Sequence, residues 1–126
     1  MSLTNVTEGH TLNWLTGNST TAPTLPLKVR LMTTNGTDAA AGTEVVGGGY
    51  VPQTATFGSA PSGGPASNSA LIRFDNMPAS TLVGFEVWDS AGTPIRWHWA
   101  AFGSPVTVQA GEPAEFAIGA LTITAD

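Results

Sequence analysis

The chain has 126 residues, four of them basic and nine acidic, with no cysteine and a formal net charge of −5. This composition excludes disulfides and cysteine nucleophiles, and four scattered basic residues lack the clustered positive face that nucleic acid or an anionic membrane requires. Charged residues make up 10% of the sequence, against about 25% in ordinary soluble domains. Because charged groups are depleted in the cores of protein interfaces, we expect large contacts with other proteins.

Residues 3–16 are the only segment with a helical pattern. Asn5 and Glu8 have the spacing of a capping box, and apolar residues recur at intervals that suit one face of a helix. We expect this helix to pack its last large apolar residues, Trp14 and Leu15, against the strands that follow.

From about residue 25 to 125 the pattern changes to short alternating segments separated by Gly, Pro, Asn and Ser. This pattern predicts about seven or eight short strands in a single domain over residues 1–126. We expect a mainly β fold, an antiparallel β-sandwich of jelly-roll-like type with one short N-terminal helix. The predicted strands are 27–31, 50–57, 69–75, 81–88, 94–101, 105–109, 114–118 and 120–124.

Two loops and one edge strand are predicted in the middle of the chain. Pro52 has no N–H to donate to a ladder, so the strand around it belongs at a sheet edge. The glycines at 47–49 lack the lysine and helix of a phosphate-binding loop, and we interpret them as a flexible entrance to that strand. Loops 37–49 and 59–68 are expected to be exposed.

Residues suited to catalysis or metal binding are few. His10 and His98 lie on separate predicted elements, so a metal site would need further ligands from elsewhere in the fold. Glu86 and Asp89 flank one turn, whereas the carboxylates of a glycosidase face each other across a cleft. No Gly-x-Ser-x-Gly nucleophile elbow is present. We expect no catalytic residue, no metal and no cofactor, and hence no enzyme.

The aromatic residues leave two interpretations open. Trp97 and Trp99 share a strand face with Ile95, which favours burial in the core or at a subunit interface. The alternative is an aromatic platform that binds a sugar. The candidate contact surface consists of Glu44, Tyr50, Pro52, Trp88, Asp89, Trp97 and Trp99.

Several short motifs occur along the chain in an order that resembles small virion proteins of tailed bacteriophages, of the tail-fibre-like, minor tail or minor capsid decoration type. The resemblance covers nearly the whole chain and depends on the order of the motifs. The motifs include Gly42-Thr43-Glu44-Val45, Gly47-Gly48-Gly49-Tyr50, Ser67-Asn68-Ser69-Ala70, Phe85-Glu86-Val87-Trp88-Asp89 and Gly111-Glu112.

The resemblance implies a non-enzymatic structural protein on the outer surface of the virion, made in the host cytoplasm. Its size favours a minor capsid or decoration protein that binds and stabilises the capsid through oligomeric contacts. The expected partners are the major capsid protein or tail proteins, and further copies of the chain, most simply in a trimer. The alternative is a tail-tip or tail-fibre component that attaches to glycans on the host surface.

Overall fold

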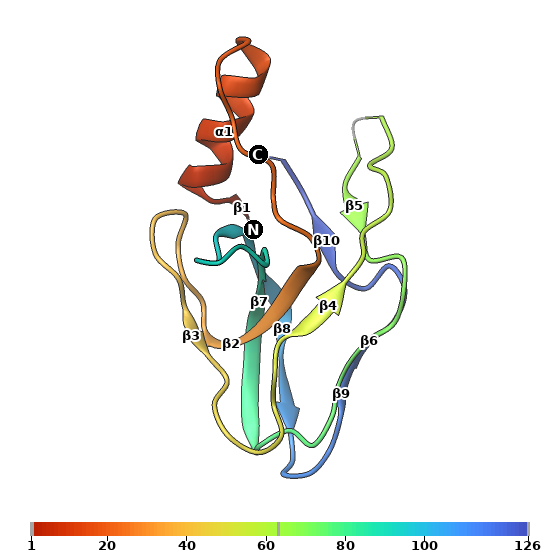
Figure 1. Ribbon diagram of the computed structural model, residues 1–126. Helices are drawn as coiled ribbons and strands as arrows, with labels where there is room; N and C mark the ends of the chain where they lie inside the picture. The colour runs from red at the N-terminus through yellow and green to blue at the C-terminus, as the bar shows by residue number, and fades with distance from the viewer. Residues whose placement is uncertain (1, 63, 126) are drawn as a thin grey trace.

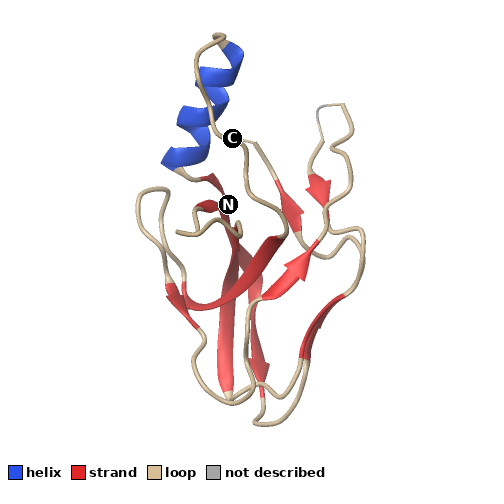
Figure 2. Cartoon of the chain, viewed as in Figure 1, coloured by secondary structure: helices blue, strands red, loops and turns tan. Residues whose placement is uncertain are grey.

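The computed structural model describes residues 2–62 and 64–125, and this part of the chain is mainly β with one helix (Figures 1 and 2). The central sheet has the order β1-β8-β7-β2-β3, and β4 shares the outer edge of β2 with β3. All of its pairings are antiparallel. The elements are β1 (Ser2–Leu3), α1 (Asn5–Leu15), β2 (Leu27–Thr34), β3 (Thr43–Glu44), β4 (Gln53–Ala55), β5 (Ala66–Ser67), β6 (Ile72–Phe74), β7 (Ser80–Trp88), β8 (Arg96–Val108), β9 (Ala114–Phe116) and β10 (Thr122–Ile123).

A second layer covers one face of the central sheet. It consists of two separate antiparallel pairs, β6 with β9 and β5 with β10, which lie to the right of the long strands in Figure 1. The predicted mainly β, antiparallel, sandwich-like fold is therefore confirmed. The second layer is divided into two short pairs, whereas a jelly roll has a complete second sheet. The buried core includes Val29, Leu31, Ile72, Phe74, Phe85 and Val87.

A chain of aromatic rings joins the two layers across the core. Tyr50 stacks on Phe74 at 5.8 Å between ring centroids, and Phe74 meets Phe116 edge-on at 6.1 Å. Phe116 then stacks on Phe102 at 5.7 Å, and Phe102 on Phe85 at 6.1 Å. These separations are typical of favourable aromatic pairs. Phe74, the second of these five rings, has no exposed surface.

The helix occupies almost the predicted residues but packs differently. Thr4 is its N-cap, and its hydroxyl accepts from the Thr7 amide, so the predicted Asn5 cap is wrong by one residue. Trp14 and Leu15 are 71% and 70% exposed, so the prediction that they pack against the strands is also wrong. The apolar residues are spread around the helix, and α1 projects from the end of the sheet (Figure 1). Because they do not form one stripe, no single face of α1 favours burial against the sheet.

The predicted strands 94–101 and 105–109 form one strand, β8, and the predicted turn at Gly103-Ser104 is wrong. Val106 pairs with Leu82 and Ala101 with Gly84, so residues 102–105 of β8 face a single residue of β7. Glycine and serine accommodate this irregular bulge. The bulge also directs the Phe102 ring onto Phe85.

The predicted strand 50–57 is shorter in the structure, but its position at the sheet edge is confirmed. Only Gln53–Ala55 forms β4, which pairs with one end of β2. Before Pro52 the chain leaves the ladder because the Tyr50 ring packs on Phe74 in the core. Gly47 and Gly48 have φ values of 109° and 55°, which favour glycine. A Cβ at Gly48 would also lie 2.8 Å from the Asn76 carbonyl oxygen. These glycines therefore let the chain pass close to Asn76, whereas we expected them to form a flexible entrance to the strand.

Candidate functional site

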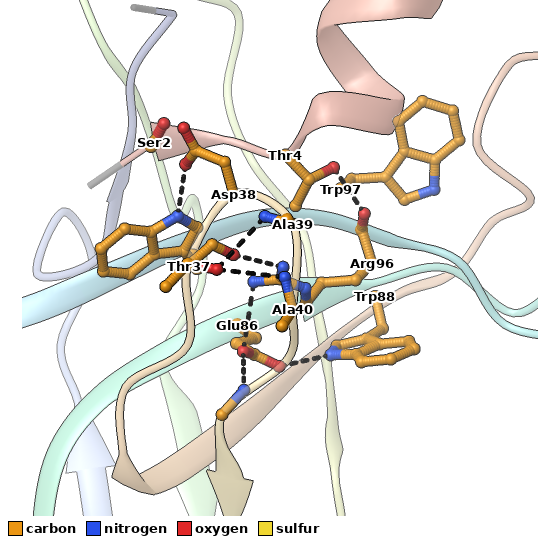
Figure 3. A network of polar contacts seen from close by, with 12 residues as sticks. Ser2, Thr4, Thr37, Asp38, Ala39, Ala40, Glu86, Trp88, Arg96 and Trp97 are labelled. Carbon is orange, nitrogen blue, oxygen red and sulfur yellow. Dashed lines mark hydrogen bonds and ion pairs between the residues drawn. The ribbon is translucent and has the colours of Figure 1, made fainter.

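Figure 3 shows a buried polar network around Glu86, which lies on the face of β7 opposite the core residues Phe85 and Val87. At its centre Glu86 of β7 is 1% exposed and Arg96 of β8 is 8% exposed. The Arg96 guanidinium lies 3.3 Å from Glu86 Oε2. The Trp88 indole N–H donates to Glu86 Oε1 at 3.0 Å. Both carboxylate oxygens of Glu86 therefore have partners, as a buried charge requires.

The loop at residues 35–42 closes over this ion pair. The Gly42 amide donates to Glu86 Oε2 at 2.9 Å, and the second guanidinium nitrogen of Arg96 donates to the Thr37 carbonyl. A Cβ at Gly42 would overlap the Thr34 carbonyl oxygen, so the loop can lie this close only because a glycine stands there. The network therefore holds residues 35–42 against the central sheet of the same chain.

The same loop is tied to β8 and to the start of the helix. The Trp99 indole N–H donates to Asp38 Oδ1 at 2.8 Å, and the Asn5 amide donates to the Asp38 carbonyl at 3.1 Å. The Thr4 hydroxyl donates to the Arg96 carbonyl at 2.8 Å. The helix, the loop and the two longest strands are consequently fixed to one another by polar contacts.

A second cluster joins three of the predicted contact residues. The Tyr50 hydroxyl donates to Glu44 Oε2 at 2.6 Å and accepts from the Leu31 amide at 3.0 Å. Burial, together with the Glu44 carboxylate, raises the pKa of Tyr50 well above its ordinary value. Arg30 lies 3.9 Å from Glu44 and places its guanidinium 4.0 Å from the centre of the Trp88 ring, within cation–π range.

Asp89 is buried and fixes the turn between β7 and β8. Its Oδ1 accepts from the Ile95 amide at 2.8 Å, and its Oδ2 accepts from the Thr24 amide at 3.1 Å. Burial by itself would raise the pKa of Asp89, but these amide hydrogen bonds favour the carboxylate and lower its pKa below the usual value. Asp89 is therefore the side-chain acceptor that holds this turn.

Replacing Asp89 with asparagine should reduce stability most at neutral pH. Because the folded pKa is lowered, the stabilisation is complete above the unfolded value of about 3.9 and is lost as pH falls through the folded pKa. An asparagine at this position has one acceptor oxygen in place of two, so we expect a loss of about 1–3 kcal/mol at pH 7 that shrinks towards pH 2. Urea unfolding at several pH values measures this. Asp75→Asn, at an exposed carboxylate, is the control. If Asp89→Asn lost no more stability than this control, and to the same extent at every pH, the role of the Asp89 carboxylate would be contradicted.

The seven predicted contact residues do not form one exposed surface. Trp97 and Asp89 are buried, whereas the other five are partly exposed. Trp97 packs beside His10 of α1, with 5.3 Å between ring centroids. Whether the partly exposed residues contact another protein stays a prediction. The partly exposed residues are Glu44, Tyr50, Pro52, Trp88 and Trp99.

Sequence reasoning missed the Glu86–Arg96 network. Alternation places Arg96 and His98 opposite Ile95, Trp97 and Trp99, but both polar residues are buried, with His98 1% exposed. A charged residue between Phe85 and Val87 in an otherwise apolar strand is the signal that points to a buried ion pair. Among the described residues, no group of three His, Cys, Asp or Glu side chains is placed to hold a metal ion, and α1 is not long and apolar enough to span a membrane.

Together these features define a small β structural domain whose polar groups hold its own loops and helix in place. The family model described as "Podophage GP4 fiber I protein gp80" matches residues 2–124. The chain belongs to this family and is a virion protein of a tailed phage, of the tail-fibre type, as its resemblance indicated. A search of curated proteins finds no match.

Proposed function

We propose that this chain is a non-enzymatic structural subunit of a podophage tail fibre, held on the outside of the particle by contacts with other virion proteins. The family description refers to a fibre, which favours this role over the capsid decoration that its size suggested. The low content of charged residues supports a protein whose surface is covered by neighbours.

The observation that carries the proposal is the exposed helix α1. None of its residues is buried, and Val6, Leu12 and Leu15 are 47%, 60% and 70% exposed. Leu12 also lines a hollow with Leu3 and Glu8 at the base of the helix. Leu12 and Leu15 are three residues apart and therefore neighbours on the helix surface, and adjacent exposed apolar residues favour contact with a protein partner. We propose that Leu12 and Leu15 contact a neighbouring tail protein.

Copies of the chain itself are the other proposed neighbours. We propose a trimer or another small symmetric oligomer, since most soluble homo-oligomers have closed symmetry. The projecting helix lies at one end of the molecule (Figure 1), which leaves the sides of the sheet for contacts between copies.

Introducing charges on α1 tests the attachment. We expect the Leu12→Lys/Leu15→Lys variant to fold but to enter particles at least about tenfold less than the wild type, because two lysines would have to lose their water at the contact. Particles grown with a tagged copy of each variant, purified and quantified by immunoblotting, give the measurement.

The matched control is Gln109→Lys, which adds a charge at an exposed position directly after β8. The segment between β8 and β9 lies at the end of the molecule opposite α1 (Figure 1). It should enter particles like the wild type. Circular dichroism of each purified variant confirms folding. Normal incorporation of the double variant would show that α1 is not the attachment surface.

A further inference from the structure

A cavity of about 450 Å³ lies between α1, the segment that returns from it and the buried Trp97. This volume falls within the range of small-molecule sites, which are concave and mostly apolar. Its walls include three aromatic rings, those of His10, Trp14 and Trp97. The Trp14 indole is 71% exposed at the rim, whereas the Trp97 ring is buried beside His10.

Hydrogen bonds fix both walls of this cavity. The Thr7 hydroxyl donates to the Trp97 carbonyl at 2.5 Å, which anchors the helix to β8. On the other side the Thr21 amide donates to His10 Nδ1 at 3.3 Å, and the Thr20 hydroxyl donates to the His10 carbonyl at 3.0 Å. Because Nδ1 accepts a hydrogen bond, neutral His10 carries its proton on Nε2. These hydrogen bonds hold the two walls of the site in place.

The lining determines the chemistry of a ligand. The described residues that line the cavity include no Asp, Glu, Lys or Arg to pair with a charged ligand, and the net charge of −5 repels acidic polymers. Four threonines also line it, and the hydroxyls of Thr7, Thr11 and Thr20 already donate to backbone carbonyls, so towards a ligand these three oxygens can only accept. A ligand that fits has an apolar face to lie on an indole and hydroxyl groups to bond at the rim.

We propose that this cavity binds a neutral saccharide, with one pyranose ring stacked on Trp14. The sugar's C–H face suits the flat indole, and its hydroxyls suit the threonines. Two other aromatic residues, Tyr50 and Trp88, are engaged within the protein, since the Tyr50 hydroxyl donates to Glu44 and Arg30 covers the Trp88 ring. Host attachment through this site rests on the proposed fibre role, but binding of the saccharide by the isolated chain does not.

Saturation-transfer NMR on the purified full chain tests the proposal, with glucose, galactose, mannose and N-acetylglucosamine disaccharides as probes. We expect at least one neutral probe to bind, and Trp14→Ala to weaken that binding by about tenfold or more. Trp14→Phe, which keeps a smaller ring, should retain part of it. Leu15→Ala is the matched control, because Leu15 is equally exposed on the same helix but does not line the cavity.

Four outcomes would overturn the assignment. They are no binding of any neutral probe, unchanged binding by Trp14→Ala, an equal loss in Leu15→Ala, and preference for a sialylated or uronic-acid probe. Since Trp14 is exposed, its substitution should leave the thermal unfolding of the protein nearly unchanged, which separates lost binding from lost folding. The absence of saccharide binding would not change the result expected for incorporation into particles. The saccharide site and the fibre role can therefore be disproved independently.

Discussion

Replacing Glu86 with alanine will lower the free energy of unfolding by about 3–5 kcal/mol. The substitution leaves the Arg96 guanidinium buried without its carboxylate and removes the acceptor of the Gly42 and Trp88 N–H groups. Small domains are stable by only about 5–15 kcal/mol, so the loss is a large part of the total. Urea unfolding followed by tryptophan fluorescence gives the value directly.

A double variant distinguishes two contributions to the free energy of unfolding. One is the penalty of leaving Arg96 buried without its carboxylate, and the other is the net contribution of the Glu86–Arg96 ion pair. Glu86→Leu/Arg96→Met replaces both partners by apolar side chains and should be clearly more stable than Glu86→Ala, because no buried charge is left alone. Loop 35–42 should nevertheless become more mobile, with faster amide hydrogen exchange, since its contact with the carboxylate is lost. A Glu86→Ala loss of no more than about 0.5 kcal/mol, the size typical of a surface substitution, would contradict this account.

Replacing Phe74 with alanine will cost about 3–5 kcal/mol. Phe74 has no exposed surface and contacts Tyr50 on one side and Phe116 on the other. Its loss removes the ring contact between Tyr50 and the β6–β9 pair and leaves a cavity in the core. Thermal or urea unfolding, with purified wild type measured in parallel, checks the prediction.

Two controls make this result specific. Phe74→Leu keeps most of the volume and should lose much less stability. Leu71→Ala, at an exposed position on the other face of the same segment, should change stability by less than about 0.5 kcal/mol. If Leu71→Ala and Phe74→Ala lowered the free energy of unfolding equally, the chain of aromatic rings would not be what stabilises the packing of the two layers.

The sequence predicts the sheet well where one face is buried. In β6 the alternation separates Ile72 and Phe74, which are buried, from Leu71 and Arg73, which are exposed. In β8 the alternation misleads, because loop 35–42 covers the second face of the sheet and buries Arg96 there. No local pattern reports that a distant loop will fold over a strand.

The helix shows a second limit of prediction from the sequence. Its residues have the propensity and the cap to form a helix, so its bounds are nearly correct, but whether Trp14 is buried depends on where the helix stands relative to the sheet. Among the predicted contact residues, Asp89 illustrates the part that could be foreseen, since an aspartate before a turn is a local signal. The contact of Tyr50 with Leu31 and Glu44 depends on the tertiary fold and could not be foreseen.

The central claim is that this chain is a structural subunit of a tail fibre. Electron cryo-microscopy of intact particles, with an antibody fragment against the chain as a marker, tests it most directly. The account predicts marked density on the tail fibres, in symmetric groups of copies, with α1 facing a neighbouring tail protein. Marked density on the capsid lattice alone would contradict the account and restore capsid decoration as the function.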